Sequence, residues 1–349
     1  MARSMKLFLI RHGETVDNVA QLYAGSRDSA LTNHGYQQAT RLGLHFKALG
    51  LTFTHLFSSH LQRAAKTAGL IREAQLPSKD ENGAAADVPE VTQLRILMEQ
   101  DFGDLEGKKW SDMQAEMRNK PGFVAVETKE AMGRRADAFL DDHLLPLLND
   151  MRNDLENTIA IVSHGIFLST LWKRLLRRLP AKSIHLCPGL HSFARPSLEH
   201  LGGWSNTGYL ELLMTRLEAE PAAFLAPSST SRSDDLQPAV FKPDTTIGTV
   251  EVPREAAQEA SDGAEAPTAA CDDAVTAPSQ AGTANAASIM ATQRTAGFFL
   301  GHEWTTTILT INGKDHLKGL KRTGGGVGSS RHDASQKGIE SFFKRRKID

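Results

Sequence analysis

The sequence has little cysteine, few tyrosines and almost no net charge. Its two cysteines, Cys187 and Cys271, are too few for a disulfide framework and lack metal-site spacing, so we expect a reducing compartment. A formal net charge of −1 gives no strong field toward nucleic acid, and we expect no direct nucleic-acid binding. No apolar run reaches membrane-spanning length, and Met1–Lys6 is too short and polar for a signal peptide. These absences favour a soluble intracellular protein without membrane contact.

What the sequence does contain is a regular alternation of short apolar runs and helical patterns. The expected strands are Lys6–Ile10, His55–Ser59, Thr158–Val162, Asn206–Thr215 and Trp304–Ile311, and the expected helices are Thr32–Ala48, Leu61–Glu73 and Ile166–Leu179. Such alternation is typical of a sheet covered by helices. The predicted fold class is therefore α/β, a three-layer sandwich with a mostly parallel sheet and helices on both faces.

Composition divides the chain into three parts. Residues 1–216 and 297–320 carry the strand and helix patterns and are expected to form one domain. Residues 217–296 are dominated by small and polar residues, and between 217 and 292 twelve acidic residues stand against three basic ones. Such a segment buries too little apolar surface to order itself, so we expect a disordered acidic insertion. Residues 321–349 are rich in Gly, Ser, Lys and Arg and are expected to form a flexible basic tail.

Two histidines occupy matching positions in the pattern. His12 and His164 each come just after an expected strand and directly before a glycine. Ligands of open α/β sheets bind beyond the carboxyl ends of the strands, and neighbouring strands lie about 4.8 Å apart, so the two rings can face one phosphate. One histidine after a strand is usually structural, but the repeated context favours a site.

Two arginines add what a phosphate needs. Arg11 adjoins His12, and Arg63 lies at the start of the helix that follows the second expected strand. A planar guanidinium binds phosphate oxygens in a bidentate manner, and a helix N-terminus adds positive potential. Alone, Arg63 would be interpreted as a solvated helix charge; beside the two histidines it indicates a phosphate pocket.

Several segments in fixed order resemble the histidine phosphatase superfamily, which includes the cofactor-dependent phosphoglycerate mutases. The matching segments are Leu9–Thr15 with Asn18, Asp28–Thr32 with Gly35, Ser58–Thr67, Glu99–Gly103 with Leu105–Gly107, and Ser163–Gly165. The resemblance covers roughly residues 6–216 and the strand near 304–312. It implies a phosphoglycerate-mutase-like fold.

The resemblance implies a role for each residue of the pocket. His12 would be the nucleophile that becomes phosphorylated. Arg11, Arg63 and His164 would form the phosphate pocket, with Asn18 as a further donor. No metal or other cofactor is implied, because arginine and histidine neutralise the phosphate.

The leaving alkoxide needs a proton, and the resemblance implies that Glu99 supplies it. A carboxylate beside a phosphate is expected to have a raised pKa, which suits an acid. Asp101 and Glu106 are rivals for this role, and each has the alternative of capping a helix or pairing with Lys108.

The sequence favours a phosphatase over a mutase. A mutase must keep water from the phosphohistidine while its product reorients, yet only Lys108–Thr128 separates Gly107 from the helix expected at Lys129, and this segment lacks an obvious second basic cluster for a carboxylated sugar acid. We expect a metal-independent phosphatase that hydrolyses a phosphate monoester through a phosphohistidine intermediate. A phosphoglycerate-mutase-type phosphotransferase is the alternative.

The last residues carry a motif of another class. Gln336, Ile339, Phe342 and Phe343 fill the defining positions of a pattern that resembles the PIP box, the peptide that docks on the replication sliding clamp, proliferating cell nuclear antigen. Lys344–Lys347 resembles a nuclear localisation signal, which implies an import receptor as a second partner and the nucleus and/or cytoplasm as the location. The alternatives are phenylalanines that pack on the enzyme domain and a basic run that only adds solubility.

A non-catalytic, clamp-binding scaffold on a phosphatase fold is the remaining hypothesis. A scaffold need not keep a complete set of Arg11, His12, Arg63, Glu99 and His164. The intact set therefore favours an active enzyme.

Overall fold

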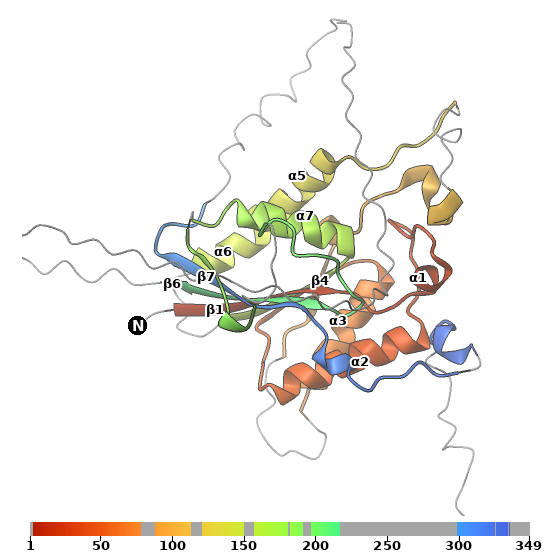
Figure 1. Cartoon of the computed structure of the whole chain (residues 1–349), viewed down its shortest axis with the longest axis horizontal. Coiled ribbons are helices and arrows are strands. Elements are labelled where there is room, and N and C mark those ends of the chain that lie inside the picture. Colours follow the sequence, from red (N-terminus) through yellow and green to blue (C-terminus); the bar gives the residue numbers. More distant parts are fainter. Residues whose placement is uncertain are drawn as a thin grey trace, which may run out of the picture. The chain divides into compact units, whose positions relative to one another are not determined.

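The computed structural model describes residues 3–77, 88–112, 121–149, 157–180, 182–190, 197–216, 299–324, 326–333 and 335 (Figure 1). All of them belong to one unit of the chain, Met1–Pro221 together with Arg294–Asp349. The other unit, Ala222–Gln293, lies outside the described residues, and so does all of the expected insertion at 217–296. The expected tail motif, Gln336–Phe343, also lies outside them.

A seven-stranded sheet forms the centre of the described unit, in the order β3-β2-β4-β1-β6-β7-β5. The strands are β1 (Arg3–Arg11), β2 (His55–Ser59), β3 (Val91–Leu94), β4 (Asn157–Ser163), β5 (Ile184–Leu186), β6 (Tyr209–Arg216) and β7 (Trp304–Gly313). Four of the pairings are parallel, and the two pairings of β6 are antiparallel. The predicted mostly parallel sheet is confirmed.

Helices cover both faces of this sheet, as Figure 1 shows. The helices are α1 (Val16–Ala20), α2 (Asn33–Ala48), α3 (Gln62–Gln75), α5 (Lys129–Phe139), α6 (Leu145–Asn149) and α7 (Gly165–Leu176), with a π-helical turn at Leu140–Leu144 that joins α5 to α6. Strand β1 separates the layers by its alternation: Leu7 and Leu9 belong to the apolar cluster of α5 and α7, and Phe8 and Ile10 to that of α2 and α3. The predicted three-layer arrangement is confirmed.

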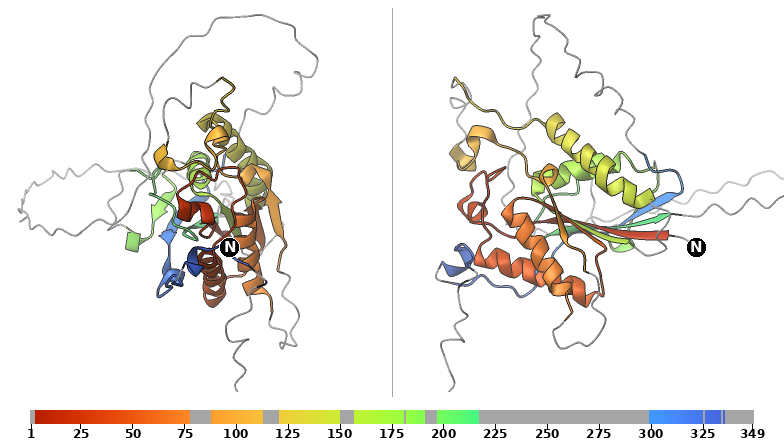
Figure 2. Two further views of the ribbon diagram at one scale, coloured as in Figure 1. Left: turned by 90° about the vertical axis from the view of Figure 1, so that its right-hand side faces the viewer. Right: turned by 180° about the vertical axis from the view of Figure 1, so that it is seen from behind.

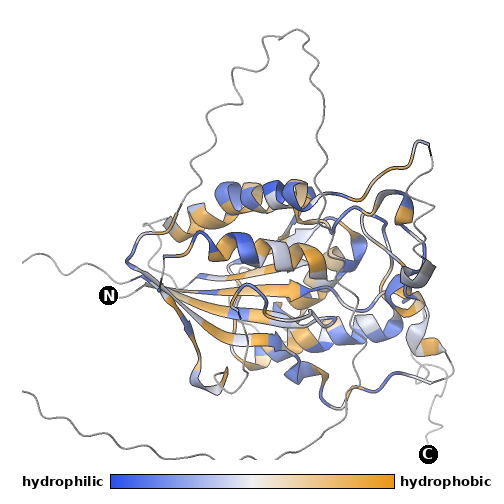
Figure 3. Ribbon diagram, turned by 45° about the horizontal axis from the view of Figure 1, so that its top comes forward, coloured by the Kyte–Doolittle hydropathy of each residue, from blue (hydrophilic) through white to orange (hydrophobic). Residues whose placement is uncertain are grey.

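Large apolar side chains bind the layers together. On one face, Phe167 and Trp172 of α7 are almost completely buried, and on the other, the ring of Phe46 lies edge-on to Phe8 with centroids 5.1 Å apart. Figure 3 shows the apolar residues on the strands and on the sheet-facing sides of the helices. Burying one such side chain stabilises the fold by about 1.5–3 kcal/mol. The strand ends that carry the site therefore belong to a sheet that is well packed on both faces.

Some element boundaries differ from the predictions. Strand β6 begins at Tyr209 instead of Asn206, because Thr207 has a left-handed backbone with φ of 56° and its N–H bonds to the carbonyls of Arg11 and His12. Helix α7 ends at Leu176 instead of Leu179. Strands β3 and β5, which form the two sheet edges, were not predicted.

The segment after β7 packs against α2 well beyond residue 320. We call residues 321–333 the strap; it includes a short 3-10 turn at Val327–Ser329, and only residue 325 within it is not described. The N–H of Asn33 donates to the carbonyl of Ser330 at 2.9 Å, and the N–H of His332 donates to the carbonyl of Leu31 at 2.9 Å. The views of Figures 1 and 2 agree in placing this C-terminal part alongside α2. The expected tail boundary at 321 is therefore too early, because the strap takes its order from backbone bonds to another element.

Candidate active site

The two predicted histidines lie side by side at the carboxyl ends of β1 and β4. These strands are parallel neighbours, and Arg11 is in register with Ser163, so the next residues, His12 and His164, are adjacent. Their ring centroids are 5.0 Å apart. Both residues are buried, with exposed fractions of 4% and 0%. The pairing expected from the sequence pattern is thus present in the structure.

The ring of His12 is held as one tautomer. Its Nδ1 lies 2.7 Å from the carbonyl oxygen of Gly13. A carbonyl only accepts hydrogen bonds, so Nδ1 carries the proton and Nε2 keeps its lone pair. Burial, together with the charges of Arg63 and Arg11, holds the pKa of His12 well below its usual value. The ring is therefore neutral and nucleophilic at Nε2.

Two glycines explain how residues 12–15, which follow β1 and which we call the catalytic loop of this candidate site, reach this position. A Cβ atom on Gly13 would lie 2.5 Å from the carbonyl oxygen of Gly35, and one on Gly35 would lie 2.0 Å from the carbonyl oxygen of Glu14. Such distances are far inside van der Waals contact. The N–H of Gly13 also donates to Oγ1 of Thr67 at 3.1 Å. The loop thus passes the first turn of α2 at a distance that only glycine permits.

His164 is held by Arg63. Nε of Arg63 donates to Nδ1 of His164 at 3.1 Å, so the proton of the neutral imidazole is on Nε2. Burial and the neighbouring Arg63 keep the pKa of His164 well below its usual value. Its Nε2 is buried and has no hydrogen-bond partner among the described residues. This Nε2–H group can therefore donate a hydrogen bond to a ligand.

Arg63 serves the site differently from what we expected. Two further nitrogens of its guanidinium donate to the carbonyls of Arg27 and Gly25 at 2.6 and 2.7 Å. Burial lowers the pKa of Arg63 to about 10, which still leaves it protonated at neutral pH. The side chain is only 1% exposed. Arg63 therefore fixes His164 and the loop of residues 25–27. Its positive charge also lowers the pKa of both His12 and His164.

Arg11 supplies a second donor without a partner. One of its terminal nitrogens donates to the carbonyl of Trp204. Its Nε is buried and has no hydrogen-bond partner among the described residues. A buried N–H without an acceptor is rare in folded proteins and calls for an explanation such as a catalytic role or a bound ion or water. Arg11, the residue before His12, and His164, whose ring lies beside that of His12, thus each carry one such donor.

Asn18 borders the same space. Its Oδ1 accepts from the N–H of Thr15 and from Nδ2 of Asn206, both at 3.2 Å. Nδ2 of Asn206 also lies 3.2 Å from the carbonyl oxygen of His12. With Oδ1 so engaged, the amide nitrogen of Asn18 is the end that remains for a ligand. Asn206 was not predicted as a site residue, because it lies far from the motif in sequence.

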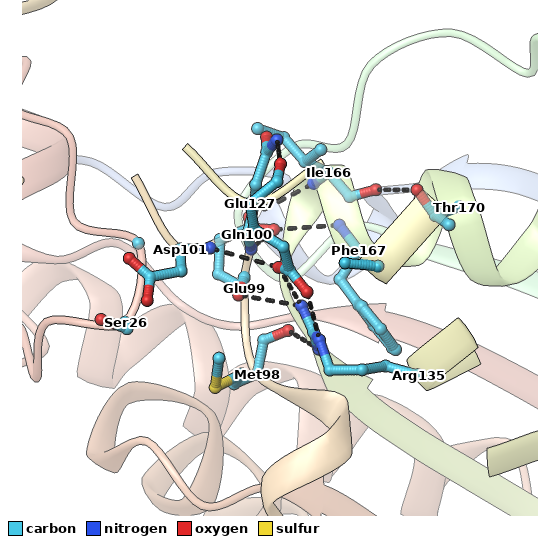
Figure 4. Close-up of polar contacts among 12 residues, drawn as sticks. Ser26, Met98, Glu99, Gln100, Asp101, Glu127, Arg135, Ile166, Phe167 and Thr170 are labelled. Carbon is cyan, nitrogen blue, oxygen red and sulfur yellow. Dashed lines mark hydrogen bonds and ion pairs between the residues drawn. The ribbon is translucent and has the colours of Figure 1, made fainter. Parts of the chain in front are cut away.

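Glu99 lies at the N-terminus of α7, where Figure 4 shows its contacts. Its Oε1 accepts from the N–H groups of Gln100 and Phe167 at 3.0 and 2.9 Å, and its Oε2 accepts from the N–H of Ile166 at 3.2 Å. The carboxylate thus occupies the positive end of the helix that follows His164. It is also the carboxylate with the largest electrostatic effect on Arg63.

Arg135 fixes the loop that carries Glu99. Its guanidinium donates to the carbonyls of Ile96, Met98 and Glu99 and pairs with Glu127 at 2.6 Å (Figure 4). No sequence pattern indicates this role, since Arg135 lies on a helix with other charged residues. The arrangement determines where the Glu99 carboxylate lies.

The rival carboxylates have structural contacts of their own. Oδ1 of Asp101 accepts from the N–H of Gly103 at 2.7 Å, and Oε1 of Glu106 accepts from the N–H of Ser26 at 2.6 Å. Both therefore stabilise turns of the loops beside the site. Neither contact involves His12 or His164.

No three His, Cys, Asp or Glu side chains of the described ranges gather as metal ligands. Within the same part of the chain, no helix has the length and apolar character needed to span a bilayer. The predicted partner-binding residues, Gln336, Ile339, Phe342 and Phe343, lie outside the described part.

Comparison with known proteins gives a consistent result. A family model described as the histidine phosphatase superfamily (branch 1) matches residues 7–195. A 2,3-bisphosphoglycerate-dependent phosphoglycerate mutase of Xanthobacter autotrophicus is 41% identical over 181 residues, which are 50% of this chain and 82% of that protein. A broad-specificity phosphatase of Saccharomyces cerevisiae is 29% identical over 164 residues, 46% of this chain and 66% of that protein. A mycobacterial glucosyl-3-phosphoglycerate phosphatase structure is 22% identical, with a TM-score of 0.44 over 60% of this chain and 91% of that one.

Proposed function

The chain belongs to the histidine phosphatase superfamily, and on that premise we propose that it is a phosphatase that hydrolyses a phosphate monoester through a phosphohistidine on His12. One observation carries the proposal. Two buried donors without a partner, Nε of Arg11 and Nε2 of His164, accompany a neutral His12 whose Nε2 is free to attack. Oriented donors around a nucleophile are what a transferring phosphoryl group requires.

The proposed reaction has two steps. Nε2 of His12 attacks the phosphorus, the P–Nε2 bond forms, and the P–O bond to the leaving group breaks. His164 and Arg11 donate to the phosphoryl oxygens, and Arg63 holds His164 with its Nε2–H available. Water then attacks the phosphorus, the P–Nε2 bond breaks, and inorganic phosphate leaves. No metal takes part in this scheme.

Glu99 is the proposed proton donor of the first step and the acceptor of the water proton in the second. Each carboxylate oxygen has about two lone pairs. Oε1 already accepts two backbone N–H groups, whereas Oε2 accepts one. We therefore assign the transferred proton to Oε2, which has a lone pair free.

Hydrolysis is proposed in preference to mutase chemistry. The family contains both activities, and the similar proteins above include a mutase and a phosphatase. A mutase must hold its product in a closed site while water is excluded. Only residues 108–128 separate Gly107 from α5, which favours an open site and transfer to water. A phosphoglycerate-mutase-type phosphotransferase remains the alternative.

The test is to trap the phosphoenzyme. Wild-type protein and His12→Ala would be mixed briefly with a radiolabelled aryl phosphate and quenched under denaturing alkaline conditions. We expect an acid-labile, alkali-stable label on the wild type alone, and release of inorganic phosphate at steady state. Label on His12→Ala would contradict the assignment. Faster transfer to an added hydroxy acid than to water would indicate a mutase, and no label on wild type would favour the scaffold hypothesis.

The tail supports a second candidate function. Gln336, Ile339, Phe342 and Phe343 have the PIP-box spacing, and we propose that they dock this enzyme on the replication sliding clamp. The neighbouring basic run, Lys344–Lys347, supports a nuclear localisation signal that an import receptor would bind. Both proposals rest on the sequence alone.

A further inference from the structure

Glu14, two residues after the candidate nucleophile, is paired with a residue of the strap. NH1 of Arg322 donates to Oε1 of Glu14 at 2.8 Å, and NH2 of Arg322 donates to Oε2. The pair is bidentate and joins positions 308 residues apart. The Glu14 side chain is only 12% exposed, whereas Arg322 is 40% exposed. A residue near the end of the described chain therefore reaches the catalytic loop.

Glu14 is held on its backbone as well as on its side chain. Its N–H donates to Oε1 of Gln38 at 2.9 Å, and its Oε1 accepts from the hydroxyl of Thr32 at 2.8 Å. Gln38 and Thr32 both belong to the start of α2, as its second turn and its N-cap. Arg322 supplies the contact that comes from outside this helix.

The same peptide unit sets the tautomer of His12. The N–H of Glu14 and the carbonyl of Gly13 belong to one planar peptide group. That carbonyl is the acceptor for Nδ1 of His12 at 2.7 Å. A rotation of this peptide group would turn the acceptor away from Nδ1, and the ring would then be free to change its tautomer or tilt.

We propose that Arg322 is a positioning residue for the nucleophile: by gripping Glu14 it holds the Gly13–Glu14 peptide group in the orientation that keeps Nε2 of His12 unprotonated and in line for attack. The proposal rests on the proposed function, in which His12 is phosphorylated. Arg322 does not touch the substrate in this scheme.

Contacts with α2 and within the strap hold Arg322 in place. The rings of Tyr36 and His332 stack with centroids 3.7 Å apart, and Nδ2 of Asn33 donates to the carbonyl of Val327 at 2.9 Å. NH1 of Arg322 also lies 2.9 Å from Oγ of Ser329 within the strap. The contact with Ser329 holds the guanidinium directly, and the other two hold the strap against α2, so the position of Arg322 does not depend on Glu14 alone.

The chain offers a matched control. Arg331 lies in the same strap and is exposed, and its side chain has no hydrogen bond or ion pair to the described residues. Arg331→Ala removes the same charge from the same segment. Any effect of Arg322→Ala that Arg331→Ala lacks then comes from the contacts of Arg322 with Glu14 and Ser329, and Glu14→Gln separates these two.

The test measures phosphohistidine formation in the full chain by rapid quench, with an aryl phosphate as substrate. We expect Arg322→Ala and Glu14→Gln each to slow this step by about tenfold, equivalent to ~1.4 kcal/mol of barrier, with KM little changed. The double variant should be no slower than the slower single variant, because the two changes break one contact. Arg322→Lys should recover part of the rate, and Arg331→Ala should match the wild type.

Nitrogen NMR of the His12 ring gives a readout that a merely structural role would not move. We expect the Nδ1-protonated form in the wild type and a tautomer mixture in Arg322→Ala. If Arg322→Ala does not fold, Glu14→Gln and Arg322→Lys decide the question. Wild-type rates and an unchanged ring in folded variants overturn the proposal. A wild type that forms no phosphohistidine instead overturns the proposed function, so the two failures are distinct.

Discussion

Arg63 donates from Nε to Nδ1 of His164 at 3.1 Å, which joins the first turn of α3 to the end of β4. This contact decides which nitrogen of His164 carries its proton. The same arginine holds the carbonyls of Gly25 and Arg27, so one side chain organises three segments of the site.

Arg63→Lys should therefore lower kcat by about 10²–10³, the usual loss when one oriented donor of a pocket is removed, because His164 would lose the bond that orients its Nε2–H. Lysine keeps the charge but cannot bond to His164 and two carbonyls in a planar fork. Steady-state kinetics of the purified variant measures the effect. Arg72→Lys on the same helix, where the arginine pairs with exposed Glu90, is the control and should leave kcat unchanged. Near-normal turnover by Arg63→Lys would show that charge alone suffices.

Glu99→Gln should slow turnover of esters with poor leaving groups by about 10²–10⁴, the scale of general acid catalysis. A nitrophenyl ester needs little protonation and should be much less affected. Comparing kcat on alkyl and nitrophenyl phosphates separates the two cases. Equal losses on both would count against Glu99, and Asp101→Asn and Glu106→Gln would then be compared in the same assay.

Acid should destabilise the fold through its buried histidines. Burial lowers the pKa of His316 to about 4, against about 6.5 in an unfolded chain. Between these values the unfolded chain binds a proton that the folded chain does not. Above about pH 6.5, His316 therefore leaves the free energy of unfolding unchanged with pH. As the pH falls from there toward 4, the free energy of unfolding decreases by up to about 1.4 kcal/mol per pH unit for this one residue.

His316→Gln should flatten this loss, because glutamine keeps a polar group near Oγ1 of Thr207, 2.9 Å from Nε2 of His316, without titrating. Urea unfolding at several pH values between about 4.5 and 7 measures the slope. His12 and His164, whose pKa values burial also lowers, should contribute to the remaining slope in the same direction. A wild-type slope in His316→Gln would contradict the argument.

Deletion of residues 219–292, with a short Gly/Ser bridge, should leave activity nearly unchanged and the melting temperature equal or slightly higher. The last residue of β6, Arg216, is paired with the first residue of β7, Trp304, so a short connection can join them. A shorter loop also closes at a smaller entropy loss. Calorimetry and phosphatase assays of the deleted chain provide the measurement. A large fall in melting temperature would mean that the deleted segment packs on the domain.

The tail peptide Arg331–Asp349 should bind the sliding clamp with micromolar affinity, near −8 kcal/mol. Ile339, Phe342 and Phe343 share one face if the segment forms a tight helical turn. Isothermal calorimetry with purified clamp measures the affinity. Replacing both phenylalanines with alanine should abolish binding and leave phosphatase activity intact. Absence of heat at high micromolar peptide would leave Lys344–Lys347 as an import signal only.

Local patterns predicted the centre of the fold well. Strands β1 and β4 each contain an apolar run, and each is followed directly by one of the two histidines, His12 and His164. Both strands are long enough for their own sequence to define them. Strands β3 and β5 have three or four residues and half-exposed patterns, so only pairing with a neighbour makes them strands. Sequence periodicity contains no record of that pairing.

The site was predictable where one residue type implies one chemistry, and less so where partners are distant. Arg63 was expected to contact phosphate, but its bond to His164 depends on the β2–β4 pairing. Asn206 and Arg135 act through backbone carbonyls, which any sequence offers. The strap resembled a tail because its composition is polar, while its order comes from bonds to α2.

The position of β7 in the sheet also affects when the sheet can be completed during synthesis of the chain. Strand β6 pairs with β1 on one side and β7 on the other, yet residues 217–303 are synthesised between β6 and β7. At about 5–20 residues per second, translation of that stretch takes roughly 4–17 s. Until β7 is synthesised, the strand Tyr209–Arg216 lacks the partner that covers this edge in the folded sheet, and an unpaired strand edge is open to pairing with other chains. The β6–β7 and β5–β7 pairings of the sheet can therefore form only after this interval.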